Sequence, residues 1–225
     1  KPLARRAKQV VSLEIDRMLI PILNVTLEKQ SNVRVICGDV MRTDLALLVK
    51  ECFGEDCSSL RIAANLPYYI TTDVLTKLMN ELPQAQSIAV MIQKEVGDKL
   101  LSSPGEDGYG PLAVMCQYHY NVVRALDVPA ACFNPPPKVD SSFMVLERLE
   151  TPYVDGGDEA VFTRLVRSAF AMRRKTLLNN LISGFALNRE QAASYLEAVG
   201  LSVQARAEEL SLEDFAKLSR QLQSL

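Results

Sequence analysis

The first hundred residues alternate short apolar runs with longer segments of helical periodicity. Apolar runs that end at Gly, Pro, Asn or Asp predict strands, and apolar residues three or four positions apart predict helices. The predicted strands lie at residues 9–14, 33–37, 60–65 and 87–93, and the predicted helices at 16–30, 44–53, 71–82 and 94–101. Strands that alternate with helices indicate a parallel sheet with crossover helices.

The pattern changes after residue 102. The composition of residues 103–110 (SPGEDGYG) predicts a mobile surface loop. Residues 121–128 and 142–148 predict a closing pair of antiparallel strands, and the proline-rich stretch between them suits neither helix nor sheet.

The remainder of the chain has helical periodicity throughout. Predicted helices cover residues 158–172, 174–183, 189–199 and 212–222, and residues 151–157 (TPYVDGG) are typical of a linker. We therefore expect an α/β domain at residues 1–150 and a small all-helical domain at residues 151–225.

Composition limits the class of protein. With 225 residues, of which 48% are hydrophobic and 23% charged, the chain is typical of a globular protein with a real core. No apolar stretch approaches the roughly 20 residues of a membrane span, so no membrane role is expected. Five scattered cysteines indicate buried free thiols in a reducing cytoplasm. The single histidine, His119, argues against histidine triads and multi-histidine metal sites, and no metal is expected.

Charge is unevenly distributed. The net charge of −2 argues only weakly against a nucleic-acid partner, because a local patch decides electrostatic attraction. Residues 161–189 contain six basic residues and no acidic one. Such a cluster is typical of a surface that binds nucleic-acid phosphates, although a solvated helix face is the alternative.

The most informative motif is Asn65-Leu66-Pro67-Tyr68, at the end of the third predicted strand. It places a carboxamide, a rigid turn and an aromatic ring at the carboxyl end of a strand, which is where open α/β sheets bind ligands. The amide accepts hydrogen bonds and the ring can stack. Together they suit a planar base with an exocyclic amine.

Two carboxylates end the preceding strands. Glu14 and Asp39 each follow an apolar run, about 25 residues apart. If the three strands are neighbours, these carboxylates share one sheet edge with Asn65. A carboxylate after the second strand of such a fold typically binds ribose hydroxyls. The alternative is that both residues only form turns or cap helices.

These motifs together resemble a known family. They comprise residues 14–16 (EID), 38–40 (GDV), 65–68 (NLPY), 133–141 (FNPPPKVDS) and 173–177 (RRKTL). In this order they are similar to the ribosomal RNA adenine dimethylases, above all to the bacterial small-subunit members, over essentially the whole chain.

The resemblance implies a Rossmann-like class I methyltransferase sheet, mostly parallel with an antiparallel closing strand, and S-adenosylmethionine as cofactor. It further implies dimethylation of adenosine amines in small-subunit ribosomal RNA, on the immature small subunit, by a cytoplasmic monomer. The family begins with a strand and a glycine-rich loop around the methionine end of the cofactor. Nothing like that loop precedes Lys1, so we expect an incomplete cofactor site in this chain.

For the target base, the resemblance implies that the Asn65 side chain and the Leu66 carbonyl accept the hydrogens of the amine. Pro67 would fix the direction of that carbonyl, and Tyr68 would stack on the base. Phe133 is the expected second wall of the pocket, with a loop anchor as the alternative. Tyr69 is expected to point away from Tyr68 and to be structural.

For the cofactor, the resemblance implies that Glu14 binds the ribose hydroxyls and Asp39 the adenine amine, between apolar walls from Ile15 and Val40. For the RNA, it implies phosphate contacts from five basic residues. These are Lys138, Arg167, Arg173, Arg174 and Lys175.

Three alternatives stay open at this point. The absent glycine-rich loop would suit a non-catalytic RNA-binding assembly factor. A large-subunit ribosomal RNA methylase shares the family, but its motif usually has the form NIPY followed by a residue other than Tyr, and it lacks a close match to RRKTL. A small-molecule or DNA adenine methylase shares the turn, but it would not account for the basic helical segment.

Overall fold

The computed structural model describes residues 1–55 and 57–223. Contacts divide the chain into two compact units, which are residues 1–61 with 69–86, and residues 62–68 with 87–225. The α/β class is confirmed, since parallel and antiparallel strands alternate with helices along the chain. The strands lie in two sheets, one of two strands and one of four.

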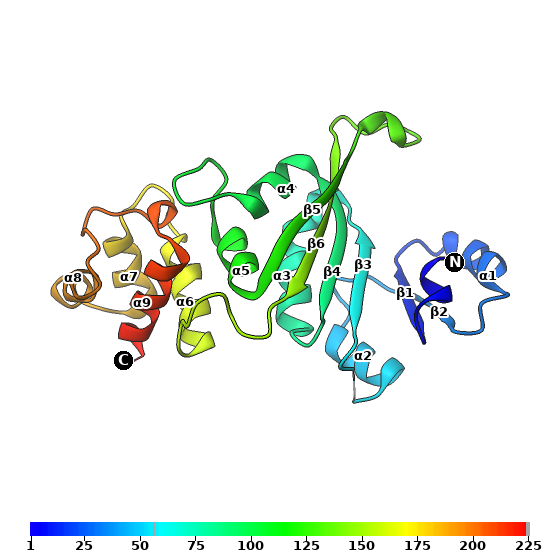
Figure 1. The fold of residues 1–225 in the computed structure, drawn as a ribbon, viewed down its shortest axis with the longest axis horizontal. Helices are drawn as coiled ribbons and strands as arrows, with labels where there is room; N and C mark the ends of the chain where they lie inside the picture. Colours follow the sequence, from blue (N-terminus) through cyan, green and yellow to red (C-terminus); the bar gives the residue numbers. More distant parts are fainter. Residues whose placement is uncertain (56, 224–225) are drawn as a thin grey trace. The chain divides into compact units, whose positions relative to one another are not determined.

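The first unit is built around a two-stranded parallel sheet, in which β1 (Val10–Glu14) pairs with β2 (Val33–Cys37) (Figure 1). Its helical elements are η1 (Leu3–Arg5), α1 (Leu19–Leu27), α2 (Leu45–Phe53) and α3 (Thr71–Glu81). Asp44 caps α2, because its side chain accepts a 2.9 Å hydrogen bond from the Leu47 amide. Glu81 of α3 accepts another from the Leu45 amide, which ties α3 to the start of α2.

The apolar face predicted for α1 is not buried. None of its nine residues is buried, and Leu19 and Ile22 are 41% and 59% exposed. Periodicity correctly predicts the helix here, but the described structure provides no core for its apolar side chains.

The second unit contains a four-stranded sheet in the order β3-β4-β6-β5 (Figure 1). Its strands are β3 (Arg61–Asn65), β4 (Ser87–Gln93), β5 (Tyr120–Val128) and β6 (Ser141–Arg148). β6 is antiparallel to both of its neighbours, which confirms the predicted closing pair. Alternate residues of β4, Ile88, Val90 and Ile92, are fully buried, as expected for a strand with one face on a core.

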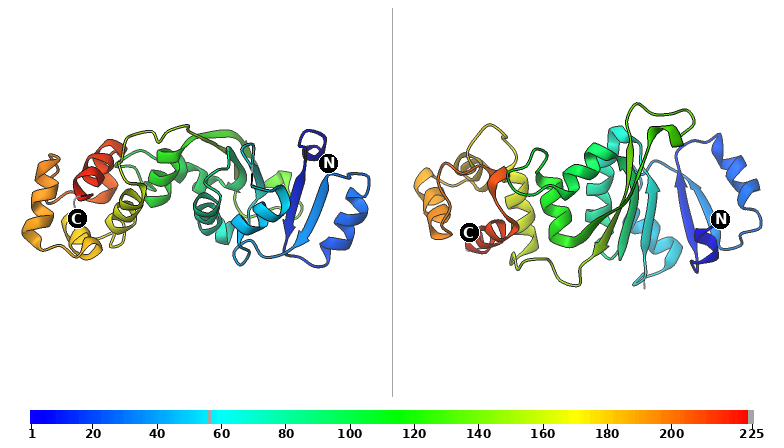
Figure 2. Two further views of the ribbon diagram at one scale, coloured as in Figure 1. Left: turned by 90° about the horizontal axis from the view of Figure 1, so that it is seen from below. Right: turned by 45° about the horizontal axis from the view of Figure 1, so that its top comes forward.

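In the described part of the chain, six helices follow β4, and the last five of them share one hydrophobic core. They are α4 (Lys94–Leu101), α5 (Pro111–His119), α6 (Glu159–Ala169), α7 (Leu177–Phe185), α8 (Arg189–Ala198) and α9 (Leu212–Leu222). The core runs continuously from α5 through α6 to α9, and Figure 2 shows α6 to α9 grouped together. At its centre the rings of Tyr118 and Phe162 stack with centroids 3.8 Å apart.

The predicted mobile loop at residues 103–110 is instead attached to the helical segment. Its Tyr109 is only 5% exposed and belongs to the hydrophobic core. The Gly105 amide donates a 2.7 Å hydrogen bond to the Glu208 carbonyl. Residues 103–107 are exposed and form a loop, as predicted. The packing of Tyr109 was not predicted, because Gly and Pro reveal a turn but not what packs against it. Helix α5, which starts with Pro111 directly after this loop, was not predicted from the sequence.

The predicted linker is also packed. The Tyr153 amide donates a 2.9 Å hydrogen bond to the Tyr118 carbonyl, on one side of the segment. On the other side, Arg220 and Gln223 of the C-terminal region donate to the carbonyls of Asp155 and Gly156. A functional division between residues 1–150 and 151–225 therefore stays a prediction, and this segment is no open hinge.

The cysteines are free thiols, as predicted, but only Cys116 is buried. Burial raises the pKa of the Cys116 thiol to about 12, so this sulfur stays protonated and inert. Cys37 and Cys132 are exposed. Among the described helices, none is both long and apolar enough to cross a membrane.

Candidate active site

The Asn65–Tyr68 turn lies where β3 ends, as predicted. The Leu66 amide donates a 3.1 Å hydrogen bond to the Met91 carbonyl of β4, and the Leu66 side chain is buried. Pro67, which has no amide hydrogen to continue the strand pairing, comes next, and a short 3-10 helix, η2 (Tyr68–Ile70), follows it. Asn65 is exposed and Tyr68 is half-buried, so one anchored leucine supports a carboxamide and a ring that a ligand can reach.

The Tyr68 ring is held at its phenol end. Its Oη lies 2.7 Å from Oγ of Ser141, and the two hydroxyls share a hydrogen bond. Ser141 is fully buried and is the first residue of β6. The motif therefore contacts a strand that follows it by 73 residues.

A charged network lies beside this contact. The Ser142 hydroxyl donates a 2.5 Å hydrogen bond to Asp127 Oδ1, and Lys94 Nζ lies 3.2 Å from Asp127 Oδ2. The bond from Ser142, followed by the contact with Lys94, lowers the pKa of the Asp127 carboxyl. Asp127 is thus kept as an anion that fixes the Ser142 side chain next to Ser141.

Phe133 and Lys138 lie on the connection between β5 and β6, visible beyond the end of these strands in Figure 2. Phe133 is half-buried, whereas Lys138 is exposed. The loop is tied back at Asp140, whose Oδ1 accepts a 2.9 Å hydrogen bond from the Ala130 amide and whose carbonyl accepts one from the Lys94 amide. Both possible roles of Phe133, pocket wall or loop anchor, are compatible with this position.

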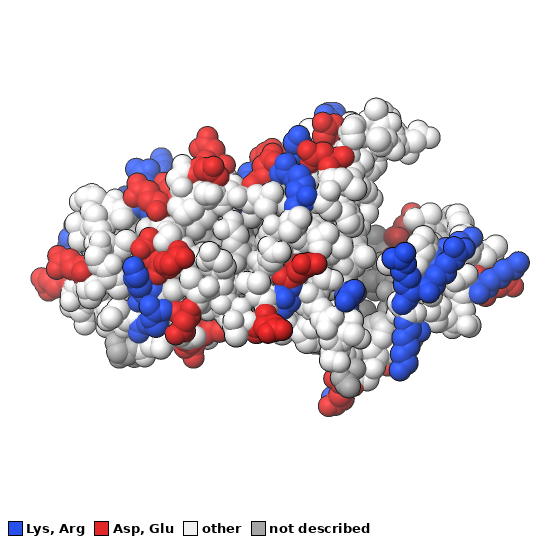
Figure 3. All heavy atoms as spheres, viewed as in Figure 1, with Lys and Arg blue, Asp and Glu red and all other residues white. Residues whose placement is uncertain are grey.

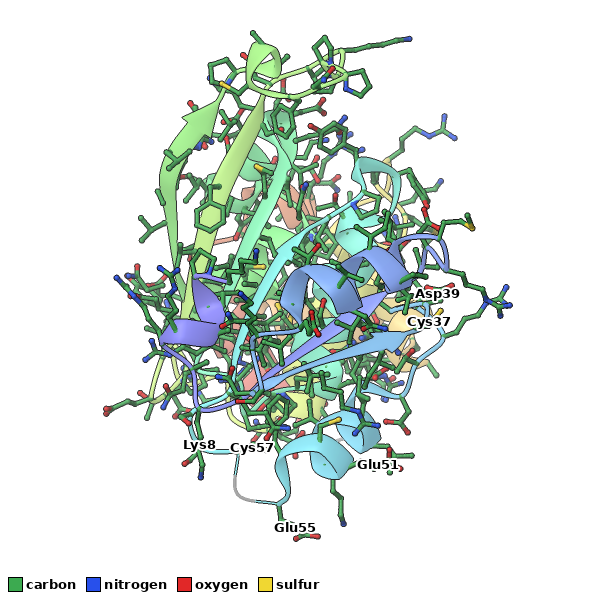
Figure 4. All side chains as sticks on the ribbon, turned by 90° about the vertical axis from the view of Figure 1, so that its right-hand side faces the viewer. Lys8, Cys37, Asp39, Glu51, Glu55 and Cys57 are labelled. Carbon is green, nitrogen blue, oxygen red and sulfur yellow. The ribbon has the colours of Figure 1, made fainter. Side chains whose placement is uncertain are left out.

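Glu14 and Asp39 lie at one edge of the β1–β2 sheet, as predicted for these two residues. Glu14 pairs with Cys37 in the parallel register, and the Gly38 amide donates a 2.9 Å hydrogen bond to the Glu14 carbonyl. Figure 4 shows Cys37 and Asp39 at this end of the strands and Lys8 at the other. Asn65 belongs to the other sheet and the other unit, so an edge shared by all three residues stays a prediction.

Both carboxylates also shape their own turns. Glu14 Oε1 accepts a hydrogen bond from the Asp16 amide at 2.9 Å, and Asp39 Oδ1 accepts one from the Met41 amide at 2.8 Å. These contacts agree with the alternative that Glu14 and Asp39 form turns. Each carboxylate has a second oxygen, which in Asp39 lies 3.7 Å from Nε of Arg42, an exposed side chain. Both carboxylate side chains are half-buried, so turn formation and ligand binding are compatible.

The donor set at this edge fits the adenosine end of S-adenosylmethionine. Carboxylates suit ribose hydroxyls and an adenine amine, and apolar side chains flank them, with Ile15 65% exposed and Val40 half-buried. Gly38 keeps the edge compact, because a Cβ there would lie 2.9 Å from Leu13 Cδ1.

The basic residues between positions 164 and 175 divide into two groups. Arg167 on α6 and residues 173–175 between α6 and α7 are exposed. Arg164 makes intramolecular contacts. Its guanidinium donates hydrogen bonds to the Gly184 carbonyl and lies 4.5 Å from the centroid of the Phe185 ring. The prediction of an RNA-binding cluster thus applies to the first group, and Arg164 is a structural residue.

Exposed basic side chains gather at a second place. In the face that Figure 3 shows, Lys and Arg predominate over η1, β1, β2 and α1. This second cluster of basic residues is visible in the sequence, since residues 1–13 contain four basic residues and no acidic one.

Tyr69 differs from the expectation that it is structural. Its side chain is 85% exposed and does not pack into a core.

Comparison with known proteins decides the family. A family model described as ribosomal RNA adenine dimethylase matches residues 1–224. The chain belongs to the ribosomal RNA adenine dimethylase family. The predicted family, activity class and S-adenosylmethionine dependence are thereby confirmed.

Two relatives within this dimethylase family illustrate the similarity. The chain is 44% identical over 223 residues to proteins from Bacillus mycoides (strain KBAB4) and Bacillus anthracis (strain CDC 684 / NRRL 3495), both named ribosomal RNA small subunit methyltransferase A. The match covers 98% of this chain and 76% of each relative.

Solved structures show the same fold. The dimethyladenosine transferase from Plasmodium falciparum matches with a TM-score of 0.78 and 23% identity, over 99% of this chain and 85% of that one. The 23S ribosomal RNA methyltransferase ErmE matches with a TM-score of 0.68 and 23% identity, over 98% of this chain and 84% of that one. These similarities support the class I methyltransferase fold.

Proposed function

We propose that this protein transfers two methyl groups from S-adenosylmethionine to the exocyclic amine of adenosines in small-subunit ribosomal RNA. Its substrate would be the immature small subunit, met in the cytoplasm, and the protein would act as a monomer. The observation that carries the proposal is the Asn65–Tyr68 turn at the exposed end of β3. The names of the 44% identical relatives favour the small over the large subunit.

The chemistry requires help at the amine. The lone pair of an adenine amine is delocalised into the ring, which makes this nitrogen a poor nucleophile. The Asn65 carboxamide and the Leu66 carbonyl would accept its two hydrogens and turn the lone pair toward the methyl group. Pro67 restricts the backbone and so fixes the direction of that carbonyl. No strong base is needed, because the nitrogen loses a proton readily once it is methylated.

The target base must leave its stack, which costs a few kcal/mol. Stacking on an aromatic side chain returns about 1–3 kcal/mol per base, so Tyr68 can offset much of that cost. Phe133 would form the second wall of the same pocket.

The bound cofactor supplies an electrophilic methyl group. Glu14 would hold its ribose hydroxyls and Asp39 its adenine amine, with Ile15 and Val40 as apolar walls. Most of the acceleration then comes from holding two reactants in line, which requires no covalent chemistry from the protein.

Residues 151–225 would act as an RNA-binding domain. The exposed cations Arg167, Arg173, Arg174 and Lys175, together with Lys138 on the β5–β6 connection, would contact phosphates. Phosphate contacts position an RNA without reading its sequence.

Transfer of tritiated methyl groups to small subunits from cells that lack this methylation tests the proposal. We expect Asn65→Ala to lower the rate by about 100-fold with folding intact, because the amine loses an acceptor that orients it. Asn121→Ala, which changes an exposed asparagine on β5, is the matched control and should keep the rate. Near-normal activity of Asn65→Ala would exclude the assigned role. Methylation of large-subunit RNA in place of small-subunit RNA would exclude the proposed substrate.

A further inference from the structure

The hydrogen bond between Tyr68 and Ser141 joins two parts of the chain that the proposed function uses separately. Tyr68 belongs to the turn after β3, and Ser141 ends the proline-rich connection that leads into β6. Their oxygens are 2.7 Å apart. The tyrosine is half-buried, but the serine is fully buried, so the bond reaches from the accessible ring into the sheet.

The sheet fixes the position of the serine hydroxyl. Ser141 lies on β6 between both neighbouring strands, with Gln93 of β4 and Val128 of β5 as its Cα partners. The residue before it, Asp140, is hydrogen-bonded through its side chain and its carbonyl. The hydroxyl of Ser141 is therefore a fixed point against which a movable ring can be placed.

A tyrosine side chain has two rotatable bonds that decide where its ring plane points. The phenol oxygen lies on the rotation axis of the second bond, so a hydrogen bond there fixes the direction of the ring axis. It also restrains the ring plane, because a phenol donates and accepts hydrogen bonds near the plane of its ring. Stacking and in-line transfer depend on the plane that the ring presents to the base. A fixed plane consequently favours one orientation of the target adenine.

We propose that Ser141 is a positioning residue for methyl transfer, whose buried hydroxyl holds the Tyr68 ring in the orientation on which the target adenine stacks. This inference rests on the proposed role of Tyr68. It adds a residue that acts through Tyr68 and does not touch the substrate.

Ser142 provides a matched control. It is the next residue on the same strand, is equally buried, and also uses its hydroxyl in a side-chain hydrogen bond, but with Asp127. Ser141→Ala and Ser142→Ala therefore remove the same group from the same strand. The first removes the hydroxyl that is hydrogen-bonded to Tyr68, and the second removes the hydroxyl that is hydrogen-bonded to Asp127.

The first measurement follows the ring itself and needs no activity. In the full chain with ¹³C-labelled tyrosine rings, assigned with Tyr68→Phe, we expect Ser141→Ala to shift the Tyr68 ring signals and to speed ring flipping. Ser142→Ala should leave these signals unchanged. Unchanged Tyr68 signals in Ser141→Ala would overturn the inference, as would equal changes in both variants.

The second measurement is single-turnover methyl transfer to unmethylated small subunits. We expect Ser141→Ala and Tyr68→Phe each to slow transfer by about tenfold with cofactor affinity unchanged, and the double variant to be no slower than either single one. Multiplicative effects in the double variant, or a full rate in Ser141→Ala, would overturn the positioning role. If the ring signals respond as expected but Tyr68→Ala transfers methyl groups normally, the proposed role of Tyr68 fails instead.

Discussion

The phenol of Tyr109 donates a 2.9 Å hydrogen bond to the backbone carbonyl of Leu210. It joins the loop after α4 to the segment before α9, inside the hydrophobic core. Burial, reinforced by the nearby carboxylates of Asp214 and Glu213, raises the pKa of Tyr109 to about 12. The phenol is therefore a donor at any pH at which the protein is studied.

Removal of this phenol should destabilise the protein. Tyr109→Phe leaves the buried Leu210 carbonyl without that donor, and we expect a loss of about 1–2 kcal/mol in the free energy of unfolding. Urea denaturation measures it. Tyr153→Phe changes a tyrosine that is 65% exposed and should cost almost nothing. Equal stability of the two variants would contradict a core role for the loop.

His119 gives the protein a pH-dependent stability. Its side chain is buried, and Nε2 lies 3.4 Å from Oε1 of Glu159. Burial, together with the positive charge of Arg148, lowers the pKa of His119, and Glu159 opposes this effect only in part. The unfolded chain, with a histidine pKa of about 6.5, binds a proton more readily than the folded protein.

The direction in which stability changes with pH follows from this difference in pKa between the folded and unfolded states. Stability from neutral His119 is complete above about pH 6.5 and is lost as the pH falls toward the lowered pKa of the folded state. We expect the free energy of unfolding, measured by urea titration, to fall as the pH is lowered below about 6.5. His119 is the only histidine, so His119→Gln should flatten this slope. A slope that persists in the variant would assign it to other groups.

The basic segment at residues 173–175 should contribute to the salt dependence of RNA binding. Replacement of Arg173, Arg174 and Lys175 by Gln removes up to three cations that neutralise phosphates. We expect the slope of log K against log salt to become shallower by about 1 for each phosphate that is no longer neutralised. Filter binding to small-subunit RNA at several salt concentrations measures it. Lys217→Gln, an exposed change on α9, should leave the slope unchanged, and the same slope in the triple variant would show a merely solvated face.

Gly156 lies against the stacked pair of Tyr118 and Phe162. A Cβ at this position would lie 2.7 Å from Phe162 Cδ2 and 2.8 Å from Tyr118 Oη. Both rings are buried and cannot move aside, so Gly156→Ala should cost about 1–3 kcal/mol in the free energy of unfolding. At Gly110 the nearest atom is 3.8 Å away, and Gly110→Ala should cost less than about 1 kcal/mol. Thermal unfolding of both variants tests this difference.

The sequence predicts elements well where local signals agree. The strands Val33–Cys37 and Ser87–Gln93 and the helices Lys94–Leu101 and Leu212–Leu222 have the predicted ends. Each combines an apolar pattern with a turn or capping residue at its boundary. Helix α5 was not predicted, because the Gly and Pro residues of the loop at residues 103–110 dominate the local composition before it.

The site is predictable only in part, for a physical reason. Asn65 and Tyr68 follow from a four-residue motif, and the common edge of Glu14 and Asp39 follows from strand spacing. The partner of Tyr68 does not, because Ser141 is 73 residues away and its hydroxyl is one of many in the chain. Only the folded sheet brings the two oxygens together.

The packed segment at residues 151–157 has a consequence for substrate selection. Hydrogen bonds hold it to Tyr118 on one side and to Arg220 and Gln223 on the other. These bonds attach the helical segment to the rest of the second unit. Folding itself then sets the span between Tyr68 and the cations at residues 173–175. From the proposed roles of Tyr68 and these cations, we expect the protein to accept an RNA whose target base and phosphates are separated by the same distance.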